Sequence, residues 1–401
     1  MDAESTLSGS LKRNRREKGL TQEQLAERSG LSVVLVAKIE QGTRRSTIDT
    51  LAKLAEALDI PLSELLDKRP RLGPDNPDAS VLAIRDVILS PALLPGVPAD
   101  ADPERSIALD ELTRSVESAL QIYRAGDFIT LTALLPNLIS EARVTAGITG
   151  NAGQEPLART YDLACFLLVQ FGRDDLASIG AERAVAAAKA SNNEVLWALE
   201  LGTYSWVLLH QGRFGEAEKL AVEAAEGIAG SFSAPAENIA AYGSLMTRAS
   251  APAASSGKDV KEYLSAAAAA GVKLGRKIKF HNRLFSSATV YKESCHAHAV
   301  RREPGLALEA ARQIRPGDLQ GVDQARTLLD IAQAHTDASH LAAAVRRLAE
   351  ARAIAPTWFP HQGVARVLID DLFEMQSRVS PELRELGAAV DANWYAPYYR
   401  R

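Results

Sequence analysis

The sequence predicts an all-α protein in which a small helical head precedes a long body of paired helices. Apolar side chains recur at helical spacing over residues 104–390, and brief turns such as Ala125-Gly126 and Gly172-Arg173 interrupt them. The alternation of apolar and polar residues that is typical of strands does not persist anywhere in the chain. Alanine-rich runs at 184–190 and 266–270 favour helix and allow two helices to approach closely.

The bulk composition is that of an ordinary soluble globular protein with room for more than one domain. The chain has 401 residues, of which 46% are hydrophobic and 24% charged. The formal net charge is -4, and residues 1–70 carry 12 Lys and Arg against 11 Asp and Glu, so net charge does not indicate nucleic-acid binding. Two isolated cysteines, Cys165 and Cys295, exclude a disulfide framework. Because no apolar segment resembles a signal peptide or a membrane span, we expect a cytoplasmic protein that does not associate with membranes.

Proline and glycine punctuation divides the chain into four parts. The segment KRPRLGPDNPDA contains three helix-breaking prolines, and PALLPGVPADADP is a second such stretch with a short apolar helix, 80–90, between the two. We therefore predict a head at 7–67, a Pro-rich linker with a short helix at 68–103, a helical repeat domain at 104–390 and an aromatic tail at 391–401.

The head carries local signals for a helix-turn-helix arrangement. Thr21 and Gln24 have the spacing of a capping box, and Ser32 is a suitable N-cap for the helix that follows it. Four consecutive apolar residues at 33–36 exceed what one buried helix stripe absorbs, so some of them must face outward. The positions that suffice for a head core are Leu25, Leu31, Val36, Ile39, Leu51, Leu54 and Leu58.

Residues 11–66 resemble the XRE, or phage-repressor, family of five-helix domains, of which the lambda repressor is typical. The resemblance is carried by L-T-Q at 20–22, G-L-S at 30–32, I-E-x-G at 39–42 and T-L-x-x-L-A-x-A-L at 50–58. It implies sequence-specific binding to double-stranded DNA, with the third helix in the major groove.

The same resemblance implies which side chains meet DNA. Val33 or Val34 would touch a thymine methyl group, the alternative being that the valine is buried, and Lys38 would donate to a guanine edge or a phosphate. Arg44 and Arg45 would contact phosphate, or else be solvated loop charges. The full predicted set comprises Gln22, Ser32, Val33, Val34, Lys38, Thr43, Arg44 and Arg45.

Two further head residues have implied roles within the domain. Arg15 and Glu40 match a family pair that forms an internal ion pair, so we assign both to structure rather than to DNA contact. Asn14 departs from the family, which usually has an apolar residue at this place in the first helix.

The body shows a repeating pattern of small and apolar residues. Its clearest copy contains Leu328, Ala332, Ala344, Leu348, Ala351 and Pro356, and it resembles the tetratricopeptide repeat (TPR), in which paired helices cross closely at small residues. A helix pair of this kind cannot bury its apolar face alone, so we predict a TPR-like α-solenoid of about five to seven stacked pairs.

The order of a helix-turn-helix head and TPR-like repeats resembles actinobacterial regulators and the peptide-sensing regulators of Gram-positive bacteria. It implies a homodimeric transcriptional regulator with a pseudopalindromic operator, whose body self-associates and senses a peptide or protein. The alternative is a TPR interaction adaptor, or an antitoxin-like partner, whose head serves only autoregulation.

Side-chain type suggests a ligand groove in the body. The segment 273–285 holds five Lys or Arg residues, and the amide of Asn282 could hold a peptide backbone, so a basic groove for a carboxylate or an acidic partner is one hypothesis. Individually, such aromatic residues are more often core and such arginines more often solvated. The groove candidates are Trp197, Tyr204, Arg248, Arg276, Asn282, Arg283 and Tyr291.

The remaining motifs argue against metal or catalytic chemistry. In Cys295-His296-Ala297-His298 the two histidines are two residues apart on a helix and point to different faces, so we expect no metal site. No catalytic motif is present, and we expect neither an enzyme nor a cofactor. The tail has four aromatic residues, Trp394, Tyr395, Tyr398 and Tyr399, which we expect to cap the open end of the solenoid, a dimer contact or groove docking being the alternative.

Overall fold

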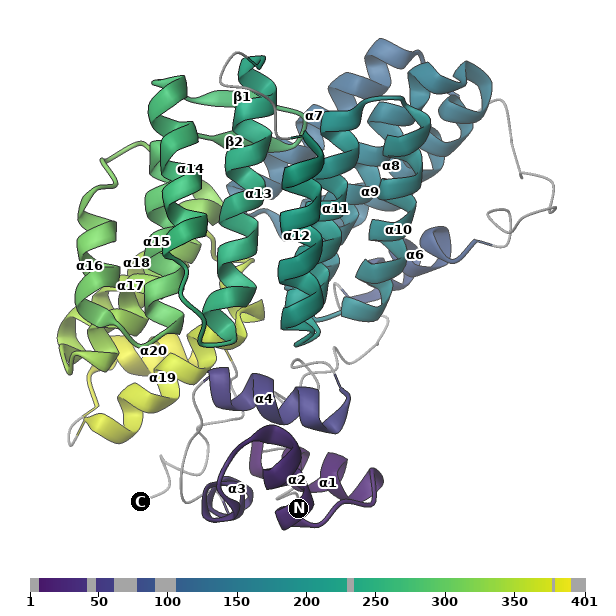
Figure 1. Cartoon of the computed structure of the whole chain (residues 1–401). Coiled ribbons are helices and arrows are strands. Elements are labelled where there is room, and N and C mark those ends of the chain that lie inside the picture. Colours follow the sequence, from purple (N-terminus) through teal and green to yellow (C-terminus); the bar gives the residue numbers. More distant parts are fainter. Residues whose placement is uncertain are drawn as a thin grey trace.

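The computed structural model describes residues 7–41, 48–60, 78–90, 106–228, 234–376 and 379–390, and it is almost entirely helical within them. This confirms the all-α fold class that the sequence predicts (Figure 1). The fifth head helix that the resemblance implies falls outside the described residues. The head helices that are described are α1 (Leu7–Glu17), α2 (Gln22–Ser29), α3 (Val33–Glu40) and α4 (Ile48–Leu58).

Helices α2 and α3 begin at the capping residues that the sequence predicts. The hydroxyl of Thr21 accepts from the backbone N–H of Gln24, and the Gln24 side chain accepts from the backbone N–H of Thr21, which completes a capping box. Ser32 caps α3 by accepting from the N–H of Leu35 at 3.2 Å. Gly30 takes the left-handed conformation, with φ of 66°, that ends α2 and turns the chain toward α3.

The body consists of consecutive antiparallel helix pairs, six of them within the described residues. Short turns at glycines join the partners of most pairs, and alanines fill the contact between them. The pairs are α7 (Leu109–Ala125) with α8 (Phe128–Thr149), α9 (Asn151–Gln170) with α10 (Asp174–Ala190), α11 (Glu194–His210) with α12 (Phe214–Ile228), α13 (Ala236–Ser255) with α14 (Lys261–Leu274), α15 (Ser287–Val300) with α16 (Pro304–Arg312), and α17 (Gly321–Asp337) with α18 (Leu341–Ile354).

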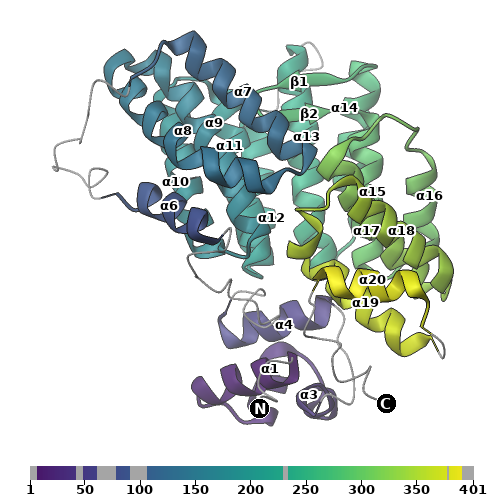
Figure 2. The same ribbon diagram turned by 180° about the vertical axis from the view of Figure 1, so that it is seen from behind.

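The first helix of each pair contacts the first helix of the next, and the series closes on itself because α17 also contacts α7. Six helices therefore form an inner ring, and their partners form an outer layer (Figure 2). The closure makes one continuous apolar core from both ends of the body, in which Leu112 and Val116 of α7 share a cluster with Ala325 and Leu329 of α17. The predicted solenoid is thus a closed ring.

The two ends of the ring meet where glycine permits a close approach. A Cβ atom at Gly321, whose φ is +54°, would lie 1.7 Å from the carbonyl oxygen of Arg124. Beside this contact, the Thr357 hydroxyl accepts from the backbone N–H of Phe128 at 3.1 Å and donates to the carbonyl oxygen of Gly126 at 2.5 Å. The joint is therefore held by backbone packing and hydrogen bonds as well as by apolar side chains.

The segment 273–285 departs from the wholly helical body that the sequence predicts. After α14 the chain forms an antiparallel hairpin of β1 (Ile278–Phe280) and β2 (Arg283–Phe285), with Ile278 opposite Phe285. The Phe285 ring is fully buried against α13, where a Cβ at Gly243 would lie 2.2 Å from it. Strands of three residues are too short to produce a detectable alternation, which explains why the sequence pattern did not reveal them.

Four further elements complete the described part of the chain: α6 (Asp78–Ile88), the 3₁₀ turn η3 (Phe359–His361), α19 (Gly363–Met375) and α20 (Pro381–Val390). Helix α6 packs on α8 and α10, and α20 packs on α18. Val367 of α19 belongs to the same buried apolar cluster as Leu54 and Leu58 of α4, so the head rests on the body through α19. No helix among the described residues has the length and apolar character that crossing a membrane requires.

Asp174, the first residue of α10, makes stability depend on pH. Its side chain is 3% exposed, and its Oδ1 atom has no hydrogen-bond partner among the described residues. Burial, assisted by the charge of Asp175, raises the pKa of Asp174 to about 7. An aspartate in the unfolded chain titrates near pH ~3.9. Between these two values the folded state binds more protons than the unfolded state, so the free energy of unfolding falls as the pH rises toward 7.

We expect Asp174→Asn to unfold with a free energy higher than that of the wild type at pH 8, by on the order of 2 kcal/mol, because the neutral amide avoids the buried charge. At pH 4.5 the difference should nearly vanish. Denaturant titrations at the two pH values measure both quantities. The matched control is Asp259→Asn, an exposed side chain whose oxygen caps the Lys261 N–H and is retained by asparagine, so this change should alter stability little. Equal stability of Asp174→Asn and wild type at pH 8 would contradict the assignment.

Candidate nucleic-acid interface

Helix α3 presents an apolar pair to solvent while it is anchored by its opposite face. Val36 and Ile39 are 0% and 1% exposed in the head core, whereas Val33 and Val34 are 39% and 63% exposed. Lys38 is also exposed. The outward direction of Val33 and Val34 follows from the helical period, since Val36 and Ile39 together fix the buried stripe.

Arg15 and Glu40 form the ion pair that the family resemblance implies. The Arg15 Nε and a terminal nitrogen donate to the two Glu40 oxygens at 2.5 and 3.0 Å, and the Glu40 side chain is 2% exposed. These hydrogen bonds to the Glu40 carboxylate raise the pKa of Arg15 above its ordinary value despite partial burial. Arg15 also donates to the Leu20 carbonyl at 2.7 Å, so it ties α1, the start of α2 and the end of α3 together.

Gln22 is part of the same network. Its Nε2 donates to Glu40 Oε2 at 2.7 Å, which orients the amide at the first turn of α2. This contact was not anticipated from the sequence, and the expected phosphate contact of Gln22 stays a prediction. Asn14, the departure from the family, is 2% exposed and donates to the Ser10 carbonyl at 3.0 Å, so a polar residue is accommodated within α1.

The orientation of the head leaves α3 away from the body. Both views show α4 between the body and the remaining head helices (Figures 1 and 2). The head contacts the body through the apolar cluster that α4 shares with Val367 of α19. Val33 and Val34, the exposed residues of α3, are not part of this cluster. Thr43, Arg44 and Arg45, the predicted loop contacts, lie outside the described residues.

Two of the groove candidates, Asn282 and Arg283, bond to other residues inside the protein. Asn282 is 5% exposed and donates to Asp162 Oδ2 and to the Arg159 carbonyl, both at 2.8 Å. Arg283 pairs with both Asp162 oxygens at 2.7 and 3.0 Å and donates to the Thr203 hydroxyl. Burial alone would raise the pKa of Asp162, but the charge and hydrogen bonds of Arg283 hold it below its ordinary value. These residues attach the hairpin to α9 and α11.

The other groove candidates do not converge on one place. Tyr204 donates to Glu182 at 3.4 Å, Trp197 lies 4.4 Å below the Lys189 ammonium group, and Tyr291 is 37% exposed on α15. Arg276 is exposed before β1. Arg248 of α13 stacks on an aromatic ring of α11, because its guanidinium lies 5.6 Å from the centre of the Trp206 ring.

The Cys-His motif of α15 is divided among separate partners. Cys295 is buried, while His296 bonds Asp330 at 2.9 Å and His298 bonds Glu303 at 2.7 Å. Across the described part of the chain, no group of three or more His, Cys, Asp or Glu side chains is placed to hold a metal ion.

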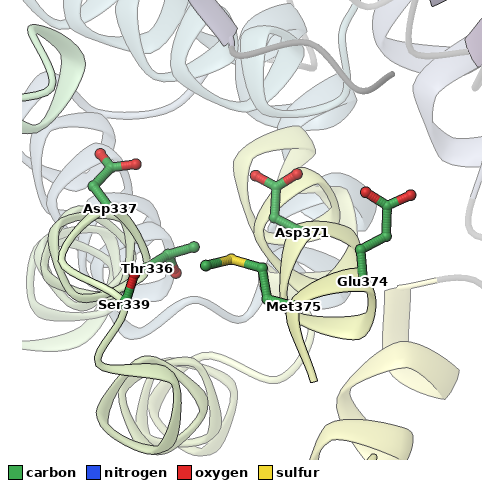
Figure 3. A pocket seen from close by; sticks show the side chains of 6 residues that line it. All are labelled: Thr336, Asp337, Ser339, Asp371, Glu374 and Met375. Carbon is green, nitrogen blue, oxygen red and sulfur yellow. The ribbon is translucent and has the colours of Figure 1, made fainter. Parts of the chain in front are cut away.

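A pocket of about 290 Å³ lies between the end of α17 and α19 (Figure 3). Three carboxylates, Asp337, Asp371 and Glu374, dominate its lining, which also includes Thr336, Ser339 and Met375. Asp337 is engaged by Arg302 and by Gln333 at 3.0 Å. A lining of this charge repels phosphate, so the pocket is unsuited to nucleic acid.

These features define a class of protein, a helix-turn-helix head with an exposed third helix on a body of paired helices. Residues 11–65 match the family model described as helix-turn-helix, HTH_3. The chain belongs to this XRE-type helix-turn-helix family. It is 42% identical over 66 residues, 16% of this chain and 86% of the relative, to an uncharacterized HTH-type transcriptional regulator, y4dJ, of Sinorhizobium fredii.

One further relative matches only the head, and two solved structures match most of the chain. Control protein C.SmaI of Serratia marcescens is 36% identical over 69 residues, 17% of this chain and 82% of that protein. Among solved structures, Bacillus thuringiensis PlcR in complex with the peptide PapR7 and DNA is 15% identical, covering 68% of this chain and 96% of its own, with a TM-score of 0.29. PrgX is 11% identical, covering 95% and 98%, with a TM-score of 0.24.

Proposed function

We propose that this protein is a dimeric, sequence-specific DNA-binding transcriptional regulator whose head reads the major groove through α3. The observation that carries the proposal is the outward direction of Val33 and Val34 on a capped helix whose other face is buried. Such a surface suits contact with thymine methyl groups, and Lys38 on the same helix can donate to a guanine edge or a phosphate. Membership of the helix-turn-helix family supports the same reading.

Dimerisation follows from the small size of this surface. One head offers few direct contacts to bases, and its net charge is close to neutral, so a single head binds weakly. Two heads held by one dimer bind neighbouring half-sites with a high effective concentration. We therefore expect a pseudopalindromic operator and self-association through the body, which also senses a peptide or protein ligand.

Exchanging single residues of the head should separate base reading from phosphate contact. Val34→Gln or Lys38→Ala should change which sequences are recovered in a binding selection with the full-length protein, because each alters a base contact. Arg44→Ala should weaken every site alike and reduce the dependence of affinity on salt by about one unit of slope. Lys219→Ala in the body, 75% exposed on α12, is the control and should change neither.

The selection also decides between the two candidate functions. Recovery of no preferred sequence by the wild type would favour an interaction adaptor over a regulator. Unchanged base preference in both Val34→Gln and Lys38→Ala would contradict the role given to α3. Sedimentation of the protein with a recovered site measures the stoichiometry, and one chain per site would contradict the dimer.

A further inference from the structure

The part of the body that joins α14 to α15 carries positive charge and no acidic residue. Between Glu262 and Glu293 the sequence has six Lys and Arg residues and no Asp or Glu. Two of these six cations are used inside the protein, because Arg283 pairs with a buried aspartate and the Lys292 ammonium group lies 3.1 Å from a Glu293 oxygen. The other four lie at 273–279, on the last turn of α14 and in the chain that forms β1.

Three of these four cations are exposed and form no ion pair with the described residues. The fourth, Lys279, pairs with Glu117 of α7. Lys273, Arg276 and Lys277 are exposed, and within the described part of the chain no carboxylate oxygen lies within 4.0 Å of their charged groups. Exposed lysines and arginines elsewhere on the body often have an acidic neighbour on the same helix. The positive charge at the end of α14 therefore faces solvent without such compensation.

A further cation joins this surface from the turn between α16 and α17. The Lys277 ammonium group donates to the backbone carbonyl of Asp318 at 3.3 Å, which places the two segments side by side. In the same turn the backbone N–H of Arg315 donates to the Asp318 carboxylate at 3.0 Å, and the Arg315 side chain is exposed. Asp318 offsets one charge of the group. The basic surface comprises Lys273, Arg276, Lys277 and Arg315.

An exposed apolar side chain adjoins the basic surface. Val272 precedes Lys273 on α14 and is 79% exposed, the largest exposed fraction among the large apolar side chains that the structure describes. A nucleic acid would meet this surface mainly through the charge of its phosphates, whereas a polypeptide can place an apolar side chain beside its carboxylates. Both views show β1 and β2 at the end of the molecule opposite α3, so DNA bound at α3 would lie at the other end (Figures 1 and 2).

We propose that the basic surface binds an acidic segment of a partner protein, whose carboxylates pair with the four cations while an apolar residue of the segment covers Val272. Arginine holds a carboxylate through paired N–H donors and lysine acts as a mobile point charge, so the two arginines orient the segment. Salt screens the attraction between exposed charges, so the affinity falls as the salt concentration rises. The inference rests on the sensing role proposed for the body and names the chemistry of the partner.

The direct test is the binding of a fluorescently labelled peptide of glutamates and leucines to the full-length protein without DNA, at about 0.15 M salt. The double variant Lys273→Gln, Arg276→Gln should bind about fivefold more weakly than the wild type, because two exposed ion pairs are lost. The matched control Lys219→Gln, Arg114→Gln removes the same charge from side chains that are 75% and 69% exposed, and it should bind as the wild type does. Val272→Ser should weaken binding about threefold at every salt concentration, since an apolar contact is not screened.

The outcomes separate this surface from general attraction by charge and from nucleic-acid binding. The proposal is overturned if the wild type does not bind the peptide, or if the control loses as much affinity as Lys273→Gln, Arg276→Gln. It is also overturned if that double variant keeps its affinity for the peptide and instead binds duplex DNA without an operator more weakly. Since DNA is absent from the peptide measurement, failure here leaves operator recognition untouched. Operator affinity measured with the peptide bound tests the sensing role separately, because an unchanged affinity would contradict sensing while the surface stands.

Discussion

Glu40→Ala is expected to lower the free energy of unfolding of the head by about 3–5 kcal/mol, because it leaves the Arg15 guanidinium enclosed without its ionic partner. Arg15 is 11% exposed, and among the described residues only the Leu20 carbonyl would still accept a hydrogen bond from it. Gln22 would lose its acceptor at the same time. A loss of this size is comparable to the whole stability of a small domain, so operator binding should disappear at physiological temperature.

Calorimetry of the full-length protein measures the effect as an early transition of the head, with the body melting as in the wild type. Glu27→Ala, an exposed position on α2, is the matched control and should leave the transition unchanged. Glu40→Gln retains an acceptor for Arg15, so its head should melt at a temperature between those of the wild type and Glu40→Ala. A head that remains folded and binds DNA in Glu40→Ala would show that the ion pair is not what holds α1 to α3.

The head could be predicted closely from sequence because its determinants are local. The capping box of Thr21 and Gln24 and the cap of Ser32 involve residues three positions apart. The outward direction of Val33 and Val34 likewise followed from counting apolar residues on one helix. The network of Gln22 with Glu40 was missed, since it joins residues 18 positions apart and depends on how α2 and α3 cross.

The body shows where local patterns stop being informative. Alanine spacing indicated the helix pairs, but closure of the ring depends on contacts such as Gly321 with Arg124, nearly half the chain apart. The contacts of Trp206 were missed for a related reason. It packs against Phe166 of α9 and beneath Arg248 of α13, so its surroundings depend on how three helices from different pairs meet.

Arg283→Met is expected to lower the free energy of unfolding of the body by about 3–5 kcal/mol, because Asp162 is 0% exposed and would lose its ionic partner. Only the Thr203 hydroxyl and the Asn282 amide would remain on that carboxylate. The double variant Arg283→Met, Asp162→Asn removes both charges and should recover much of the loss. Denaturant unfolding of the three variants and the wild type provides the comparison.

The pH dependence distinguishes this structural role from the ligand contact that the sequence suggested for Arg283. In the wild type the pKa of Asp162 is held below its ordinary value, so the stabilisation by the pair is present above pH ~4 and is lost as the pH falls through the folded pKa. Without Arg283 the buried carboxylate resists ionisation, and its pKa should rise above that of an unfolded aspartate. The deficit of Arg283→Met should therefore be largest at pH 7–8 and shrink toward pH ~4. A ligand-binding arginine would instead leave unfolding nearly unchanged at every pH and abolish only the response to ligand.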